Sequence, residues 1–234
     1  MQKSMINLLS VADSISILNA VFGLLSIIVL FGNFDFEFSF KIRLAVSFIL
    51  LAILADGLDG IAARSLGKSE IGEILDSMAD MTSFVIAPAI FIYFIYSQSF
   101  DFFNYSNIYL LVALVLYLSF GIIRLASFHL MKEKEYFLGM PTPASTIILV
   151  ICAFFKIDFI YILPIVVIIG ALMASSIRFP KPRTKMDLVA TILILLTLIL
   201  GKDYFGIAPI TLLIAILFYV ILSPIYYNFF KKRQ

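Results

Sequence analysis

The sequence contains few of the residues that soluble or disulfide-linked proteins need. Charged residues make up 14% of the chain, against a usual value of about 25%, whereas hydrophobic residues make up 62%. A soluble protein of 234 residues has too little interior to bury that much apolar surface, and the same composition excludes a disordered chain. The single cysteine, Cys152, excludes a disulfide framework and a zinc-ribbon site. Tryptophan is absent, so Tyr and Phe must supply any aromatic belt at a membrane interface.

Long apolar runs predict membrane helices. A bilayer-spanning helix needs roughly 20 apolar residues, and the candidate spans are Ser14–Gly32, Ile42–Gly57, Ile74–Tyr96, Ile108–Leu130, Pro143–Phe155, Phe159–Ile177, Leu188–Leu200 and Ile207–Tyr227. The fifth and seventh are short, at about 20 Å if fully helical. We therefore predict an all-α, polytopic membrane helix bundle of about eight transmembrane helices, forming a single domain over residues 1–234. The mildly amphipathic segment Met1–Asp13 is expected to form a short interfacial helix.

The distribution of basic residues predicts the orientation. With eight spans both termini lie on one side of the membrane, and that side carries Lys3, Arg64, Lys68, Lys132, Lys134, Arg178, Lys181, Arg183, Lys185, Lys231, Lys232 and Arg233. The opposite side carries only Lys41, Arg43, Lys156 and Lys202. The positive-inside rule then places both termini in the cytoplasm, in a protein of the cell membrane. We expect no nucleic-acid partner.

Four aspartates lie at the ends of two predicted spans. Asp56 and Asp59 end the second span, and Asp76 and Asp80 open the third. An ionised side chain in the bilayer costs at least ~2.5–3.5 kcal/mol on insertion scales, so four carboxylates need more positive charge than Arg64 supplies. Spacings of three and four place each pair on one helical face. Antiparallel packing of the two helices would bring all four carboxylates together.

Small residues share these helical faces. Gly60, Ala63 and Gly72 allow another backbone or a bulky ligand to come close. Oxygen ligands around one cavity suit Mg²⁺, Mn²⁺ or Ca²⁺, and two such ions about 3.5–4 Å apart form the usual clamp for displacement at phosphorus. Alternatively, the aspartates cap helix ends and pair with Arg64 and Lys68. Four carboxylates at matched spacing, with glycines between them, favour a metal site.

This pattern resembles the signature of the CDP-alcohol phosphatidyltransferases, D-x2-D-G-x2-A-R-x8-G-x3-D-x3-D. Every specified position matches, at Asp56, Asp59, Gly60, Ala63, Arg64, Gly72, Asp76 and Asp80. Seven residues rather than eight separate Arg64 from Gly72, and the difference falls in the loop between the two helices. The resemblance implies an enzyme that binds a CDP-linked lipid with its pyrophosphate on divalent metals, while an alcohol displaces CMP. It also implies a homodimer.

The resemblance further implies roles for individual residues. The metal ligands would be Asp56, Asp59, Asp76 and Asp80, holding two ions of Mg²⁺ or Mn²⁺. Asp80 would also be the general base that deprotonates the alcohol. The nucleotide site would consist of Asn19, Asp59, Gly60, Ala63, Arg64 and Gly72. For Asn19, an ordinary hydrogen bond between helices is the alternative.

The second half of the chain resembles the phosphatidylserine synthase branch of this family. The segments that carry the resemblance are Arg124–His129, Gly139–Ser145 and Ala174–Lys181. Ser127 and His129 depart from the branch pattern, which has arginine and asparagine there. The implied reaction transfers a phosphatidyl group from CDP-diacylglycerol, or an ether-lipid equivalent, to the hydroxyl of L-serine.

The acceptor would need its own binding groups. Arg124 is the candidate for the serine carboxylate, because a guanidinium binds carboxylates in a fixed geometry. A structural ion pair with a site aspartate is the alternative. Arg178 and Lys181 either hold the lipid-linked phosphate or simply obey the positive-inside rule.

Other functions remain as alternatives. A sister enzyme using glycerol phosphate or inositol phosphate could recruit Arg124, Arg178 and Lys181 for a second phosphate. Intramembrane prenyltransferases also use paired aspartates, but their motifs do not predict the small residues found here. A cation transporter would more often have two related halves, and the sequence has one acidic cluster. Release of CMP distinguishes the phosphatidyltransferases from both of these classes.

Overall fold

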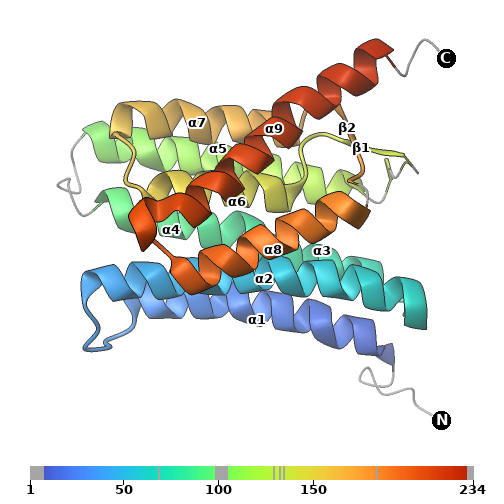
Figure 1. The fold of residues 1–234 in the computed structure, drawn as a ribbon, viewed down its shortest axis with the longest axis horizontal. Helices are drawn as coiled ribbons and strands as arrows, with labels where there is room; N and C mark the ends of the chain where they lie inside the picture. The colour runs from blue at the N-terminus through green and yellow to red at the C-terminus, as the bar shows by residue number, and fades with distance from the viewer. Residues whose placement is uncertain are drawn as a thin grey trace. The chain divides into compact units, whose positions relative to one another are not determined.

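The computed structural model describes residues 8–67, 69–97, 105–128, 130–131, 133, 135–182 and 184–230. Over these residues all the regular secondary structure is helical apart from two short strands (Figure 1), which confirms the predicted all-α membrane bundle. In chain order the elements are α1 (Val11–Phe31), α2 (Phe38–Leu66), α3 (Gly72–Asp80), the π-helix η2 (Met81–Ile86), α4 (Ala87–Ser97), α5 (Tyr105–Phe128), β1 (Tyr136–Leu138), α6 (Thr142–Phe154), α7 (Phe159–Met173), β2 (Arg178–Pro180), α8 (Thr184–Leu200), the 3₁₀ turn η3 (Tyr204–Gly206) and α9 (Ile207–Phe230).

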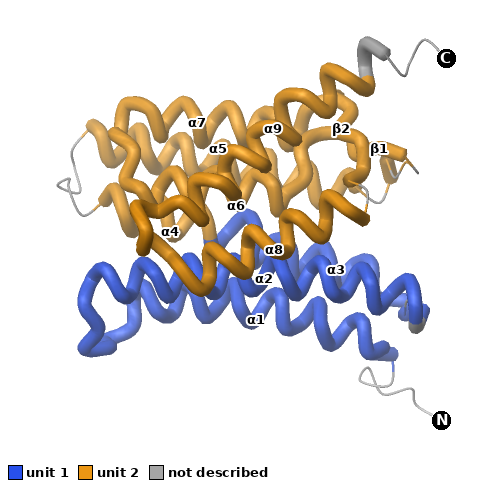
Figure 2. The backbone as a smooth tube through the Cα atoms, in the orientation of Figure 1, with its two compact units in different colours: residues 1–87 blue, residues 88–234 orange. Residues whose placement is uncertain are grey.

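The chain forms two compact units, residues 1–87 and residues 88–234 (Figure 2). In the first unit, α1 packs along α2 and also contacts α3 and η2. Helix α1 starts with a capping box, in which the Ser10 side chain accepts from the backbone of Asp13 and the Asp13 carboxylate accepts from the backbone of Ser10. Helix α2 ends before Gly67, whose φ of 89° lies in the left-handed region that favours glycine.

The second unit is built around α6, which is buried over nearly its whole length and contacts α7 and α9. Helix α5 packs on α7, and α8 packs on α9. Strands β1 and β2 pair antiparallel, with Phe137 opposite Phe179. Gly139 follows β1 with a φ of 75°, and a Cβ there would collide with the carbonyl oxygen of Met173. The sequence did not predict this small sheet.

Every predicted span lies on a helix, although not every helix is long. Five helical segments are long and apolar enough to cross a membrane: Val11–Phe31, Phe38–Ser65, Gly72–Ser97, Tyr105–Phe128 and Tyr204–Tyr227. Helices α6 and α7 have 13 and 15 residues, and α8 has 17. At 1.5 Å per residue, α6 spans about 20 Å of a hydrocarbon core about 30 Å thick. The chain is therefore a multi-pass membrane protein, and the count of eight crossings stays a prediction.

The start of the chain differs from the predicted interfacial helix over Met1–Asp13. Residues 1–7 lie outside the described residues, and residues 11–13 form the first turn of α1 instead of a separate helix. The Ser10 capping box explains the difference, because it starts the long helix at Val11.

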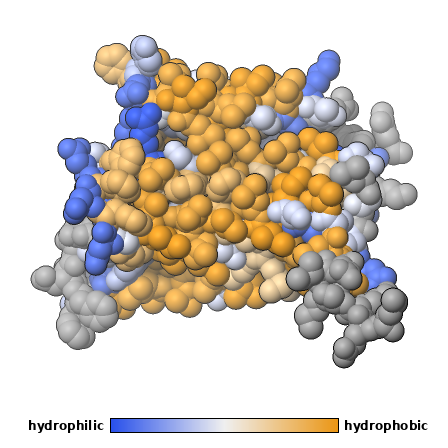
Figure 3. Space-filling view, turned by 90° about the horizontal axis from the view of Figure 1, so that it is seen from below, coloured by the Kyte–Doolittle hydropathy of each residue, from blue (hydrophilic) through white to orange (hydrophobic). Residues whose placement is uncertain are grey.

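The surface agrees with a lipid environment. Hydrophobic residues cover the middle of the face in Figure 3, and hydrophilic residues gather toward its two ends. Large apolar side chains are exposed along single helices, for example Ile17, Val21 and Leu24 on α1. A soluble protein rarely exposes so many large apolar residues together.

Candidate active site

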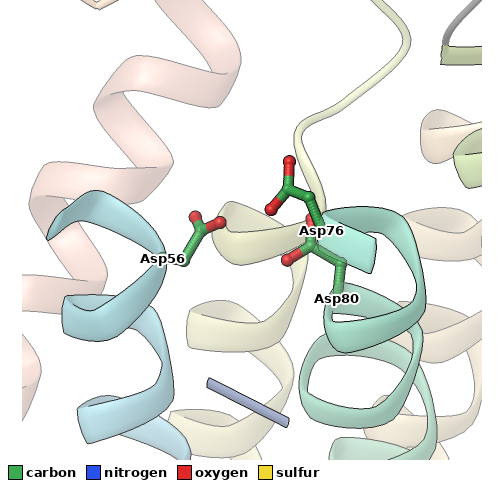
Figure 4. Close-up of side chains that lie close together, drawn as sticks. All are labelled: Asp56, Asp76 and Asp80. Carbon is green, nitrogen blue, oxygen red and sulfur yellow. The ribbon is translucent and has the colours of Figure 1, made fainter. Parts of the chain in front are cut away.

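Three of the four predicted aspartates meet between α2 and α3. Asp56 belongs to α2, whereas Asp76 and Asp80 lie one turn apart on α3. One oxygen from each carboxylate lies within 4.8 Å of the others, and all three residues are half-buried. Figure 4 shows the Asp56 carboxylate directed from α2 toward the two carboxylates of α3. Negative charges this close together repel one another, so the group favours a bound cation.

The fourth aspartate, Asp59, lies outside this group of three oxygens and contacts α1. Its side chain is 7% exposed, and its Oδ2 accepts a hydrogen bond of 2.6 Å from Oγ of Ser16. Asp59 is nevertheless close enough for its negative charge to repel those of Asp56 and Asp80. The structure therefore brings three predicted ligands together and holds the fourth nearby on α2.

Helix α1 also reaches Asp80. The Nδ2 atom of Asn19, a fully buried residue, donates to Oδ1 of Asp80 at 3.2 Å. The hydroxyl of Ser83 donates to the Asn19 carbonyl at 2.8 Å. Asp80 is the last residue of α3, and the π-helix η2 begins at the next residue. Single π-helical turns inside longer helices are frequent at functional sites.

The small residues of the motif have different surroundings. A Cβ added to Gly60 would meet nothing within 4 Å, so this part of α2 is open to a ligand. Ala63 is half-buried and Arg64 is exposed, one turn further along α2. Gly72 is buried, and a Cβ there would lie 2.8 Å from Oδ1 of Asp13 on α1. Close packing against α1 is therefore a sufficient reason for glycine at this position.

The donor atoms fit a hard divalent cation. The three oxygens that lie within reach of one another all belong to carboxylates, at Asp56, Asp76 and Asp80. Carboxylate oxygens suit Mg²⁺ and Mn²⁺, whereas zinc and copper sites usually include nitrogen or sulfur ligands.

The second unit contains a pocket of about 180 Å³ beside the C-terminal end of α5. Its polar lining residues are Arg124 and Ser127 on α5, Glu133 in the following loop, Tyr136 on β1 and Ser175 after α7. Arg124 is 8% exposed, and its guanidinium carbon lies 5.1 Å from the ring centroid of Phe128. One arginine, one glutamate and three residues with hydroxyl groups thus line the pocket together with apolar residues.

The other two predicted acceptor residues are not among those that line this pocket. The guanidinium of Arg178 lies 5.1 Å from the ring centroid of Tyr136, and the ammonium of Lys181 lies 5.2 Å from that of Phe137. Lys181 Nζ also donates to the Glu133 carbonyl at 2.6 Å. Both cations therefore contact aromatic rings of strand β1, and Lys181 also binds the loop before that strand.

Comparison with known proteins agrees with the site. Residues 9–224 match the family model described as CDP-alcohol phosphatidyltransferase, which covers both units of the chain. The chain belongs to this family. It is therefore a phosphatidyltransferase, and the three clustered carboxylates occupy positions of the family signature.

Several relatives of this phosphatidyltransferase are named for their acceptor. The chain is 31% identical over 202 residues to the CDP-diacylglycerol–serine O-phosphatidyltransferase of Methanocaldococcus jannaschii, covering 85% of this chain and 88% of that protein. It is 34% identical over 186 residues to the archaetidylserine synthase of Methanothermobacter thermautotrophicus, covering 76% and 73% of the two chains. It is 36% identical over 147 residues to the serine enzyme of Bacillus subtilis, covering 60% and 76%.

Two polar residues of this phosphatidyltransferase were missed in the sequence. Ser16 donates a hydrogen bond to the signature aspartate Asp59. The sequence signal for this residue was its spacing of three and seven residues from Asn19 and Gly23, which places all three on one face of α1. Glu133 lies in a segment of alternating charge, which is typical of a solvated turn. No local pattern indicates that Glu133 lines a pocket with Arg124, because that depends on how the loop packs.

Proposed function

We propose that the protein transfers a phosphatidyl group from a CDP-lipid, either CDP-diacylglycerol or its ether-lipid equivalent, to the hydroxyl of L-serine and releases CMP. The observation that carries this proposal is the group of three carboxylates, Asp56, Asp76 and Asp80, whose oxygens lie within 4.8 Å at positions of the family signature. The serine enzymes among its relatives support serine as the acceptor.

The four signature aspartates would hold two divalent ions, Mg²⁺ or Mn²⁺. When bound, such ions neutralise negative charge on a pyrophosphate and on the departing phosphate. Asp56, Asp76 and Asp80 would supply the shared oxygens. Asp59 would contribute a further carboxylate oxygen from α2, where Ser16 orients it.

Asp80 would act as the general base. A serine hydroxyl is a poor nucleophile at neutral pH, so a base within hydrogen-bond reach must accept its proton. The proton moves to a carboxylate oxygen of Asp80, the serine oxygen forms a bond to the lipid-linked phosphorus, and the bond from that phosphorus to the CMP oxygen breaks. Asn19 supports this role, because its amide holds Oδ1 of Asp80 and so orients the carboxylate.

The nucleotide would lie along the open face of α2. Gly60, Ala63 and Arg64 follow the aspartates on this helix, and the free space beside Gly60 supports a bulky ligand there. Asn19 donates to Asp80, and Gly72 lies close to Asp13 of α1, so we propose that both shape this site through the packing of α1.

The pocket beside α5 would bind the serine. A free amino acid carries a carboxylate and an ammonium, and the pocket offers Arg124 for the first and Glu133 for the second. Planar guanidinium groups bind carboxylates in a paired geometry. Ser127 and Ser175 would complete the polar contacts. Arg178 and Lys181 would stabilise the pocket wall through β1.

A phosphorylated acceptor is the second candidate within the family. It would require several cations around one pocket, whereas Glu133 adds a negative charge to the lining. We further propose that the chain works as a single domain, as a homodimer, with both termini and the active site on the cytoplasmic side of the cell membrane.

The test is CMP release by the purified protein in detergent with CDP-diacylglycerol and Mg²⁺ or Mn²⁺. The acceptors are none, L-serine, glycerol 3-phosphate and inositol phosphate, and each is repeated with an ether-linked CDP-lipid. We expect release that requires both L-serine and the metal. Release with a phosphorylated acceptor alone would overturn the serine assignment, and no release from either lipid would overturn the proposed activity.

A further inference from the structure

Helix α1 presents buried polar side chains to the site from within a membrane span. Ser16, Asn19 and Ser26 lie on one face of this helix and are at most 4% exposed. Two of them contact signature aspartates, since Ser16 donates to Asp59 and Asn19 donates to Asp80. Serine and asparagine side chains in membrane helices commonly form hydrogen bonds to neighbouring helices. The contacts suggest that α1 is part of the site as well as of the bundle.

The Ser16 hydroxyl has two acceptors within reach and only one proton. Its Oγ lies 2.6 Å from Oδ2 of Asp59 and 3.3 Å from the carbonyl oxygen of Ala12. Hydrogen bonds to ionised acceptors are shorter and stronger than those to neutral ones. The proton therefore belongs to the bond with Asp59.

This bond restrains a carboxylate that its neighbours repel. The negative charge of Asp59 and those of Asp56 and Asp80 repel one another. The bond from Ser16 to Oδ2 fixes the direction of the whole planar carboxylate of Asp59. We infer that Ser16 is a positioning residue, which holds the Asp59 carboxylate in one orientation at the metal site. This inference rests on the proposed function of the four aspartates.

Ser16 can do this because α1 is itself held in place. The Ser83 hydroxyl donates to the carbonyl of Asn19, three residues after Ser16. At Gly23 the two backbones approach so closely that a Cβ would lie 2.7 Å from Cα of Ser83. The helix is therefore fixed against η2, and a hydroxyl at residue 16 has a defined position relative to α2.

The test compares the Mn²⁺ affinity of Ser16→Ala with that of Ser26→Ala. Electron paramagnetic resonance measures Mn²⁺ binding to the purified full chain in detergent, without any lipid substrate. Ser26 is the matched control, because it is a buried serine on the same helix whose Oγ has no hydrogen-bond partner among the described residues. Loss of a group that orients a metal ligand typically weakens metal binding about 10–100-fold. We expect a loss of that order for Ser16→Ala and less than about twofold for Ser26→Ala.

Two further variants separate positioning from a general loss of structure. Ser16→Thr keeps the hydroxyl and should restore most of the Mn²⁺ affinity. Ser16→Cys keeps the size but is a weak donor, so it should bind Mn²⁺ as poorly as Ser16→Ala and provides the same test if the alanine variant does not fold. In an Asp59→Asn background, Ser16→Ala should cause no further loss.

Wild-type Mn²⁺ affinity in both Ser16→Ala and Ser16→Cys would overturn the inference. The inference would also be overturned if Ser16→Ala lowered the Mn²⁺ affinity equally in the wild-type and Asp59→Asn backgrounds, because Ser16 would then act through another group. The proposed function fails separately, if the wild-type protein binds Mn²⁺ but releases no CMP with any acceptor.

Discussion

Nδ2 of Asn19 donates a hydrogen bond to Oδ1 of Asp80 across 3.2 Å, and this contact joins the first membrane helix to the proposed general base. Asn19 is fully buried, and its carbonyl is fixed in turn by Ser83, three residues after Asp80. The site thus depends on three segments, because α1 orients carboxylates that belong to α2 and α3.

Replacement of Asn19 by leucine removes the amide and keeps a similar volume. A hydrogen bond to a charged group contributes about 1.5–3 kcal/mol, so we expect kcat to fall at least about tenfold. The KM for the CDP-lipid should change little, and steady-state CMP release measures both constants. A rise in this KM with kcat unchanged would instead favour a direct contact between Asn19 and the nucleotide.

Asp80→Asn should leave CDP-lipid binding measurable and abolish turnover. The amide cannot accept the serine proton, and general-base catalysis typically contributes about 10²–10⁴-fold. Equilibrium binding of the CDP-lipid and CMP release measure the two effects. Asp35→Asn is the control, because Asp35 is an exposed aspartate in the loop between α1 and α2. Near-normal turnover of Asp80→Asn would remove Asp80 from the role of base.

Gly60→Ala and Gly57→Ala form a matched pair on α2. A Cβ at either position would meet nothing within 4 Å, so both variants should fold. Alanine in a helix is favoured over glycine by about 0.5–1 kcal/mol, and thermal unfolding in detergent should show no loss of stability. Only Gly60→Ala should raise the KM for the CDP-lipid, because Gly60 belongs to the proposed nucleotide face. Equal effects of the two variants on this KM would contradict that assignment.

Arg124 and Glu133 should recognise different ends of the acceptor. Arg124→Lys loses the planar fork that binds a carboxylate, so it should raise the KM for serine about tenfold with little effect on the CDP-lipid. Glu133→Gln should raise the same KM by weakening the contact with the ammonium. Ethanolamine lacks the carboxylate of serine, so the preference for serine over ethanolamine should shrink in Arg124→Lys. Glycerate lacks the ammonium, so the preference for serine over glycerate should shrink in Glu133→Gln.

An equal loss for serine and CDP-lipid in Arg124→Lys would favour a structural role of Arg124. Unchanged discrimination against glycerate in Glu133→Gln would remove Glu133 from the acceptor site. Both comparisons use CMP release with each acceptor at several concentrations.

Much of the architecture follows from hydrophobic runs and spacing in the sequence. Each predicted span lies on a helix, and the signature spacing places Asp56, Asp76 and Asp80 within reach of one another. Strands β1 and β2 could not be predicted in this way. They have three residues each, too few to show an alternating pattern, and they depend on a pairing between distant segments.

The supporting contacts of the site were also hidden in the sequence. A serine such as Ser16 in an apolar helix is compatible with many roles, and only the packing of α1 on α2 shows its contact with Asp59. For Lys181 the sequence predicted a phosphate ligand or a topology signal, and it did not predict the hydrogen bond from its ammonium to the carbonyl of Glu133. Such roles depend on tertiary packing, which local spacing does not determine.

The most direct test of the central claim follows the serine oxygen into the product. The purified protein is given CDP-diacylglycerol, or its ether-linked equivalent, with Mn²⁺ and L-serine whose hydroxyl carries heavy oxygen, and both products are analysed by mass spectrometry. We predict a serine-headgroup lipid that retains the heavy oxygen, unlabelled CMP, and no product from Asp56→Asn. Failure to form this lipid from either donor, or a lipid without the label, would contradict the account.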